Sequence, residues 1–284
     1  MIHLGDFELH LLSDGTFRLD GGSMFGVVPK VLWQRTDPAD EMNRILMGLN
    51  CLLVRTGREN VLIETGIGSR LPSKDREIFG VEQPKTLMDR LKELGLAPED
   101  IHVVICSHLH FDHVGWNTRV DKNGARVPTF PRADYVIQRA EWEAATQPNI
   151  RTRTNYAEEH FLPLKANGVL RLVDGQEVIG DGFEVIRTGG HSDGHQVVKI
   201  TSAGQTALFL ADLVPMVSHI KIPYVMSYDL YPMQTIEAKE RILKQAFEEE
   251  WLLIFVHSPT VGMGYLRDKD GKWTVETVER VRYE

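Results

Sequence analysis

Short apolar runs separated by turn residues recur along most of the chain, and they predict strands. These runs contain few polar side chains, which is typical of strands that are buried on both faces. The predicted strands cover residues 7–12, 48–54, 60–63, 103–106, 135–137, 183–186, 197–200, 207–210 and 252–256. The Asp270-Gly271 pair predicts the turn of one more hairpin over residues 265–275.

Helical spacing of apolar residues is clearest at residues 86–94, where positions 87, 88, 91 and 94 are apolar and Gly95 ends the pattern. Further helices are expected over residues 141–146, 154–164 and 235–251. Strands in direct succession with helices between them predict mixed α/β layers. No repeat or linker interrupts the pattern, so we expect one domain over residues 1–284. Residues 14–47, with Pro29 and Pro38, predict a long functional loop.

Composition and charge narrow the class of protein. The 284 residues are 42% hydrophobic and 25% charged, as in ordinary globular proteins. The two cysteines, Cys51 and Cys106, lie inside apolar runs and predict buried, reduced thiols. A net charge of −8 disfavours nucleic-acid binding. No apolar run approaches the ~20 residues of a membrane span and no signal peptide is expected, so we predict a cytoplasmic protein, with a homodimer left open.

The candidate chemistry begins directly after the predicted strand at residues 103–106. Four side chains able to bind a metal occupy six consecutive positions there: His108, His110, Asp112 and His113. Imidazole nitrogens and carboxylate oxygens together suit zinc and similar divalent ions. A stretch of six residues cannot close a metal site by itself, so further ligands must come from elsewhere in the chain.

Three other apolar runs each lead to a side chain of the same kind, namely His191, Asp212 and His257. A single histidine or aspartate after a strand is more often a surface residue or a cap. If the strands lie side by side, however, their carboxyl ends form one rim. The resulting set of five histidines and two aspartates fits two metal ions with one bridging carboxylate.

The order of these residues carries a family resemblance. The H-x-H-x-D-H motif, the Gly190-His191 pair, an aspartate after an apolar strand and a late histidine together resemble the metallo-β-lactamase-fold hydrolases. The resemblance covers essentially the whole chain and implies an αββα four-layer sandwich with two metals at one edge. It implies that His108, His110 and His191 hold the first metal and that Asp112, His113 and His257 hold the second, with Asp212 bridging.

The resemblance also implies roles around the metals. Zinc is the default for both divalent ions, with manganese, cobalt or iron as alternatives. His195, in the Gly-His loop, is expected to support a ligand and not to be one. Glu64 stands where the family usually has the aspartate of Asp-Thr-Gly, and we expect it to orient a ligand imidazole.

Within the family, the chain resembles the lactonase and methyl-parathion-hydrolase-like branch. The similarity lies in residues 211–215, His219, Met226 and the Tyr228-Asp229 pair. Pro215 departs from the tyrosine that the best-known acyl-homoserine lactonases place three residues after the bridging aspartate. Only 27 residues follow His257, too few for the helical domain of glyoxalase II-like enzymes. The implied activity is opening of lactones or cleavage of related esters, with phosphotriester or aryl ester hydrolysis as the runner-up.

The implied mechanism uses a hydroxide that bridges the two metals and attacks the substrate. Asp112 and Asp212 are then the catalytic residues, and Asp112 also passes a proton to the leaving group. The expected substrate-binding residues are Met24, Phe25, Trp116, His219 and Tyr228. The alternative for the apolar ones is ordinary core. A non-hydrolytic metal-binding or redox module remains the competing class of function.

Overall fold

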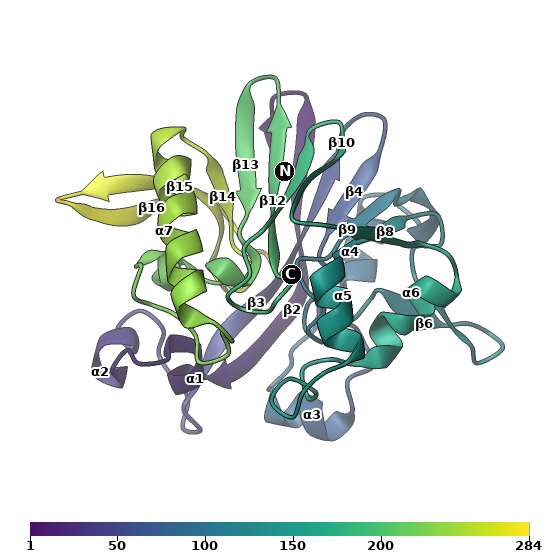
Figure 1. Ribbon diagram of the computed structural model, residues 1–284, viewed down its shortest axis with the longest axis horizontal. Helices are drawn as coiled ribbons and strands as arrows, with labels where there is room; N and C mark the ends of the chain where they lie inside the picture. Colours follow the sequence, from purple (N-terminus) through teal and green to yellow (C-terminus); the bar gives the residue numbers. More distant parts are fainter. Residues whose placement is uncertain (284) are drawn as a thin grey trace.

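The computed structural model describes residues 1–283 and contains two seven-stranded sheets packed face to face, with helices on both outer surfaces (Figure 1). The first sheet has the order β1-β2-β3-β4-β5-β8-β9. Its strands are β1 (Ile2–Leu4), β2 (Phe7–Asp20), β3 (Arg44–Arg55), β4 (Asn60–Ile63), β5 (Val103–Ile105), β8 (Asp134–Gln138) and β9 (Leu170–Val173).

The second sheet follows chain order from β10 to β16. Its strands are β10 (Gln176–Gly180), β11 (Phe183–Arg187), β12 (Gln196–Ser202), β13 (Gln205–Phe209), β14 (Leu252–Ile254), β15 (Val261–Lys269) and β16 (Lys272–Arg280). Two short strands, β6 (Thr118–Val120) and β7 (Arg126–Pro128), form a separate ribbon. The predicted strands and the terminal hairpin are thus confirmed.

Helices complete the outer layers. The first sheet is covered by α4 (Leu87–Glu93), α5 (Arg139–Thr146) and α6 (Leu162–Ala166), and the second by α7 (Pro232–Glu248). Three short helices lie near one end of the sandwich: α1 (Gly21–Phe25), α2 (Lys30–Trp33) and α3 (Ser73–Ile78). The layers confirm the predicted αββα architecture. No helix within residues 1–283 is both long and apolar enough to cross a bilayer.

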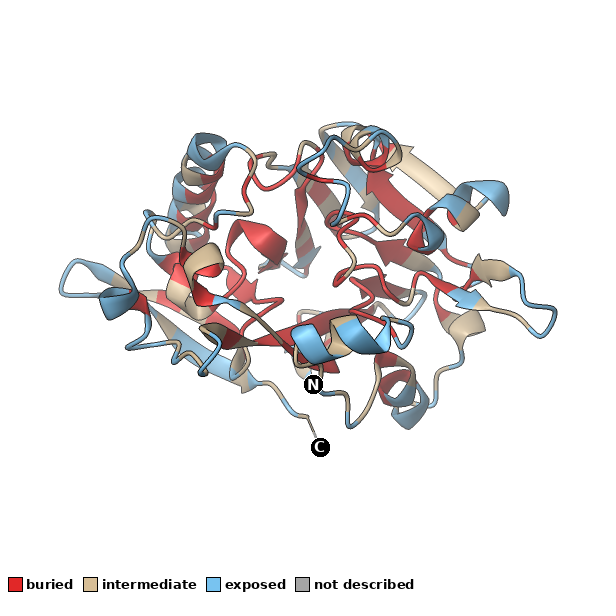
Figure 2. Ribbon diagram, turned by 90° about the horizontal axis from the view of Figure 1, so that it is seen from below, coloured by how far each residue is buried: buried red, intermediate tan, exposed pale blue. Residues whose placement is uncertain are grey.

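Burial on both faces explains the continuous apolar runs. In β3, Leu52 and Val54 pack between the sheets, whereas Cys51 and Leu53 pack under the helices. Strand β14 divides its side chains in the same way, between the inter-sheet core and α7. Each such buried side chain contributes about 1.5–3 kcal/mol. Seen from below, buried segments run through the middle of the molecule and exposed ones lie on the outside (Figure 2).

Two predicted segments differ from the structure. Residues 154–164 are not one helix, because Pro163 is tolerated only in a first helical turn, and α6 therefore begins at Leu162. Residues 14–47 are not one irregular loop. Strand β2 continues to Asp20 through a bulge in which Gly15 has φ 111°, and β3 already begins at Arg44. The glycines that predicted a loop serve the bulge and helix α1.

Strand directions bring the chemistry to one edge. In the first sheet β4 and β5 are parallel, and in the second β11, β13 and β14 run the same way. Two of these strands end in a left-handed residue, Glu64 (φ 67°) after β4 and Ala211 (φ 46°) after β13. This conformation costs an L-residue about 1–2 kcal/mol, so the turns are held by their surroundings.

Candidate metal centre

Seven side chains meet where these strands end. His108, His110, Asp112 and His113 follow β5, His191 follows β11, Asp212 follows β13, and His257 follows β14. All seven are at most 8% exposed. Three overlapping groups have ligand atoms within 4.8 Å of one another: His108/His110/His191, His108/His113/Asp212 and Asp112/His113/His257. The structure therefore brings together every residue expected to bind metal.

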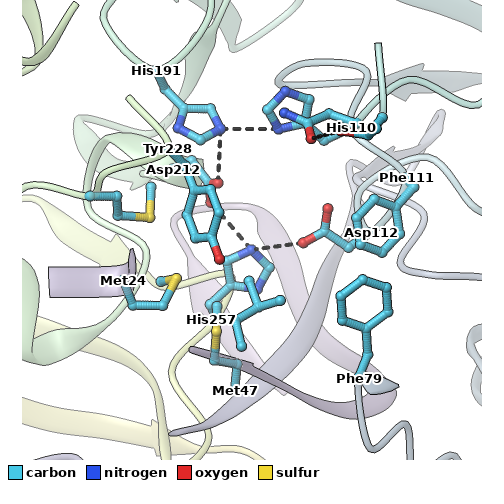
Figure 3. A pocket seen from close by; sticks show the side chains of 14 residues that line it. Met24, Met47, Phe79, His110, Phe111, Asp112, His191, Asp212, Tyr228 and His257 are labelled. Carbon is cyan, nitrogen blue, oxygen red and sulfur yellow. Dashed lines mark hydrogen bonds and ion pairs between the residues drawn. The ribbon is translucent and has the colours of Figure 1, made fainter. Parts of the chain in front are cut away.

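Asp212 lies between the two outer groups and turns one oxygen toward each. Its Oδ2 is 3.2 Å from His191 Nε2 and 3.9 Å from His108 Nε2. Its Oδ1 is 3.3 Å from His257 Nε2 and 3.7 Å from His113 Nε2. This is the arrangement expected of a carboxylate shared by two cations (Figure 3).

The donor set fits two divalent cations. His108 Nε2 and Asp212 Oδ1 are buried and make no hydrogen bond, which is costly unless another partner is supplied. Nitrogens of different imidazoles face each other at 3.2 Å, His191 with His110 and His257 with His113. One outer group offers three imidazoles, and the other offers two imidazoles and a carboxylate. Both are suitable ligand sets for zinc-like ions.

Electrostatics favour the ligand forms of several of these groups. Burial and the neighbouring imidazoles hold the pKa values of His108 and His110 well below the usual range, which keeps both rings neutral. Burial raises the pKa of Asp212, but the imidazoles of His113 and His257 outweigh it and keep the carboxylate ionised. His113 differs from His108 and His110. Burial lowers its pKa, but the carboxylates of Asp112 and Asp212 outweigh burial, so the pKa of His113 is raised overall.

Outer hydrogen bonds fix the imidazole rings. His113 Nδ1 lies 3.1 Å from Glu64 Oε2, so Glu64 contacts an imidazole of the cluster, which is the position that its expected role requires. His257 Nδ1 donates to the Gly48 carbonyl at 2.8 Å. His195 accepts from the Asp212 backbone N–H through Nε2 at 3.0 Å and so supports the cluster from behind, as expected. Such contacts set the tautomer and the ring plane of a ligand.

Two further buried carboxylates that support the ligands were not predicted from the sequence. Asp229 Oδ1 lies 2.8 Å from His191 Nδ1. Glu141, at the start of α5, accepts hydrogen bonds from the backbone beside the ligands. The Tyr228-Asp229 pair contributes to the family resemblance, but nothing in its spacing connects Asp229 to His191. Glu141 begins the helix predicted over residues 141–146, where an acidic residue is ordinary, so nothing in the sequence indicates its contacts.

A cavity opens onto the cluster and exposes five of the seven side chains, all but His108 and His113. The rest of its wall is mostly apolar, as Figure 3 shows around Phe79, Phe111 and Met47. The complete non-ligand lining is Leu19, Met24, Met47, Phe79, Phe111, Thr154, Asn155, Met226 and Tyr228. Two of the five residues expected to bind substrate, Met24 and Tyr228, therefore line the cavity.

The other three do not line it, and their assignment is corrected. Phe25 is fully buried and stacks between Trp33 and His219. His219 Nε2 is 2.8 Å from the Met24 carbonyl oxygen, so it supports α1 from behind the wall. The Trp116 indole N–H donates to the buried carboxylate of Asp14 at 2.8 Å. Aromatic side chains that form core cannot be distinguished in sequence from those that line a cavity.

Comparisons with known proteins agree with this geometry. An N-acyl homoserine lactonase from Bacillus cereus is 31% identical over 160 residues, which are 53% of this chain and 57% of that protein. The chain thus spans just over half the length of the curated relatives it matches first. A Staphylococcus aureus structure described as "a probable metal-dependent hydrolase" superposes with a TM-score of 0.89 and 31% identity, covering 98% of this chain and 100% of the other.

A third comparison concerns the fold alone. AidC, a dizinc quorum-quenching lactonase, has a TM-score of 0.76 and 23% identity, over 99% of this chain and 97% of its own. The family model of the metallo-beta-lactamase superfamily matches residues 46–257, a span that runs from β3 to the last histidine of the cluster. The chain belongs to the metallo-beta-lactamase superfamily.

Proposed function

We propose that the chain is a two-metal hydrolase that opens lactones. The observation that carries the proposal is Asp212, whose two oxygens face two separate groups of ligands at the floor of an apolar cavity. The relatives named as N-acyl homoserine lactonases, such as the one from Bacillus cereus, support a lactone as the substrate.

In this proposal His108, His110 and His191 hold the first metal, Asp112, His113 and His257 hold the second, and Asp212 bridges them. Zinc is the proposed ion, with manganese, cobalt and iron as alternatives that the same ligands accept. Two bound divalent ions supply a water molecule of lowered pKa and polarise the carbonyl group under attack. The ligands themselves do not distinguish one lactone from another, so selectivity must come from the wall of the cavity.

Two side chains have further roles. Burial raises the pKa of Tyr228, so its phenol stays protonated in the cavity and can donate to the lactone carbonyl oxygen. That donation stabilises the negative charge that develops during attack. The carboxylate of Asp112, which also lines the cavity, accepts the proton that the attacking water releases and passes it to the alkoxide oxygen when the ring opens.

The wall suits an uncharged substrate. Among its described residues there is no lysine or arginine, and Leu19, Met47 and Met226 present apolar surface. An acyl chain or aryl group fits such a wall better than an anionic substituent does. Aryl phosphotriesters share these properties, so they are the second candidate substrates.

Two broader predictions complete the proposal. The excess of acidic residues and the two buried free thiols agree with a cytoplasmic location. We also keep a homodimer as a prediction. The proposed activity does not depend on it, because all seven ligands come from one chain.

The first test is metal content per chain by mass spectrometry, together with hydrolysis of lactones, aryl esters and phosphotriesters by the same sample. We expect about two metals, loss of lactone turnover on chelation and its return when metal is added back. The Tyr228→Phe variant is expected to keep both metals and to lose about 10²–10³-fold in kcat. One metal or none, without turnover after reconstitution, would contradict the proposal and favour a metal-binding module.

A further inference from the structure

Glu141 is a fully buried acid that touches none of the candidate ligand atoms. It lies in the first turn of α5 with an exposed fraction of 0%. Burial raises the pKa of its carboxyl group, and hydrogen bonds from Ser192 and Leu109 oppose that rise. A buried carboxyl group is costly unless its oxygens are paired, so its partners indicate what it is for.

The two oxygens of Glu141 accept hydrogen bonds from three segments that are distant in sequence. Oε1 accepts from the Leu109 backbone N–H at 2.9 Å and from the Tyr156 hydroxyl at 3.2 Å. Oε2 accepts from the Ser192 hydroxyl at 2.6 Å and from the Gly194 backbone N–H at 3.3 Å. One carboxylate therefore joins the loop after β5 to the loop after β11.

The positions of these partners relative to the ligands are specific. Leu109 lies between His108 and His110, and Ser192 directly follows His191. These three histidines form one of the two outer ligand groups. Within residues 1–283, no hydrogen bond of the Glu141 carboxylate reaches a residue next to Asp112 or His257.

The other ligand group has its own carboxylate. Glu64 contacts the His113 imidazole through Oε2 and accepts from the Ser107 backbone N–H through Oε1 at 2.9 Å. Glu64 is also almost fully buried. Glu64 thus holds an imidazole of the second group directly, while its other oxygen binds the backbone next to His108 of the first group.

The loop after β11 is shaped to approach Glu141 closely. A Cβ atom at Gly194 would lie 2.1 Å from the Glu141 backbone nitrogen, so only glycine fits there. Tyr156, the fourth partner, forms a backbone bridge with His110 and follows the wall residue Asn155. Glu141 therefore connects the first ligand group to one part of the cavity wall as well.

We propose that Glu141 is a positioning residue for the metal held by His108, His110 and His191, and that Glu64 serves the other metal. The inference rests on the two-metal site proposed above but not on the identity of the substrate. Without the carboxylate, the loops after β5 and β11 lose their common anchor, and the three imidazoles no longer converge. Loss of such an outer contact typically lowers metal affinity about 10–100-fold.

The test compares Glu141→Gln with Glu64→Gln, since glutamine keeps the shape but replaces one acceptor oxygen with an NH₂ group. Each variant is equilibrated at a series of buffered free zinc concentrations. Zinc per chain is then measured by mass spectrometry, and occupancy at each ligand group is measured from anomalous scattering in crystals.

We expect Glu141→Gln to hold zinc at His108/His110/His191 about 10–100-fold more weakly, while Asp112/His113/His257 stay filled. Glu64→Gln should weaken zinc mainly at Asp112/His113/His257, where the side chain contacts an imidazole, and less at His108/His110/His191, which it reaches only through the Ser107 backbone. Equal loss at both groups, or wild-type affinity at both, would overturn the proposal. Lactone turnover is not needed for this readout, so failure of the proposed substrate would leave the result interpretable.

A milder variant keeps the test decisive if Glu141→Gln fails to fold. Ser192→Ala removes only the hydroxyl that donates to Glu141 Oε2. We expect a several-fold weaker zinc affinity confined to the His108/His110/His191 group. Ser202→Ala is the matched control. Ser202 is also buried, but it lies at the end of β12 that is farther from the loop after β11, and its hydroxyl accepts a hydrogen bond from the Asp6 backbone N–H. Unchanged zinc binding in Ser192→Ala would contradict the proposal.

Discussion

The ligand cluster and the cavity wall are built in different ways. The seven candidate ligands follow strands, and hydrogen bonds from three of the imidazoles to Glu64, Asp229 and the Gly48 carbonyl fix the rings from behind. The wall comes mostly from short helices and connecting segments. Met24 lies in α1, Phe79 follows α3, and Met226 and Tyr228 lie in the segment before α7.

This difference separates chemistry from selectivity. The strands are held in two sheets, so the cluster has one arrangement, whereas connecting segments tolerate substitution and insertion. Changes in the cluster should therefore alter metal content and turnover of every substrate. Changes in the wall should alter preference among substrates and leave the metals in place.

Among the variants that test this difference between cluster and wall, Asp212→Ala is expected to have the largest effect. Because Asp212 faces both ligand groups, we expect metal content to fall below two per chain and kcat/KM to fall by about 10³-fold or more, or about 4 kcal/mol. Metal analysis and lactone kinetics on the same preparation measure both effects. Asp181→Asn, a change at an exposed carboxylate, is the control. Two metals and near-normal turnover in Asp212→Ala would refute the shared-carboxylate arrangement.

A variant in the cavity wall tests whether substrate preference can change without a change at the ligand cluster. Phe79 stacks on Phe111 with ring centroids 5.2 Å apart, and both line the cavity. Phe79→Ala should raise KM for a long-chain acyl lactone about tenfold, with little change for a lactone lacking the chain, since one apolar group in a pocket contributes about 1–3 kcal/mol. The exposed neighbour Ile78 provides the control Ile78→Ala. Equal KM changes for both lactones, or a loss of metal, would show that wall and cluster are not separable.

The smallest effect on turnover is expected at Lys239 in α7, which holds the segment before that helix in place. The Lys239 ammonium group donates to the carbonyl oxygens of Lys221 and Tyr224 at 2.9 and 2.7 Å. Burial lowers its pKa to about 7. Between that value and 10.5, the unfolded chain binds the proton and the folded chain does not, so folding stability attributable to this group rises with pH.

The corresponding measurement compares wild type with Lys239→Met by chemical denaturation at several pH values. The difference in the free energy of unfolding should shift in favour of wild type from pH 7 to pH 9, by up to about 1.4 kcal/mol per pH unit. A pH-independent difference would mean that Lys239 keeps the same protonation state when the chain folds.

Much of the architecture and all seven candidate ligands followed from the sequence, for one physical reason. Strands buried on both faces are continuous apolar runs, so a histidine or aspartate at the end of a run is conspicuous. His191, Asp212 and His257 stand out in this way, although they lie far apart in the chain. The family resemblance then supplied their grouping, which the geometry matches.

The outer layer and the wall could not be predicted to the same depth. Glu141 and Asp229 act through contacts that only tertiary packing creates, and neither has a spacing that reveals its partner. Phe25 and Trp116 have the same apolar character as Phe79 and Met24, so sequence could not say which of them faces the cavity. The bulge at Gly15 and the position of Pro163 decided the two segments where the expected secondary structure was wrong.

Phe111 has a consequence for how such a protein can change its substrate. It lines the cavity, yet it lies between His110 and Asp112, which belong to different ligand groups. We expect a substitution at this position to disturb both neighbouring ligands, so new selectivity gained there is coupled to the metal site. Mutational paths toward new substrates are therefore expected to run through Phe79 and Met226, where the wall can vary while the reaction is conserved.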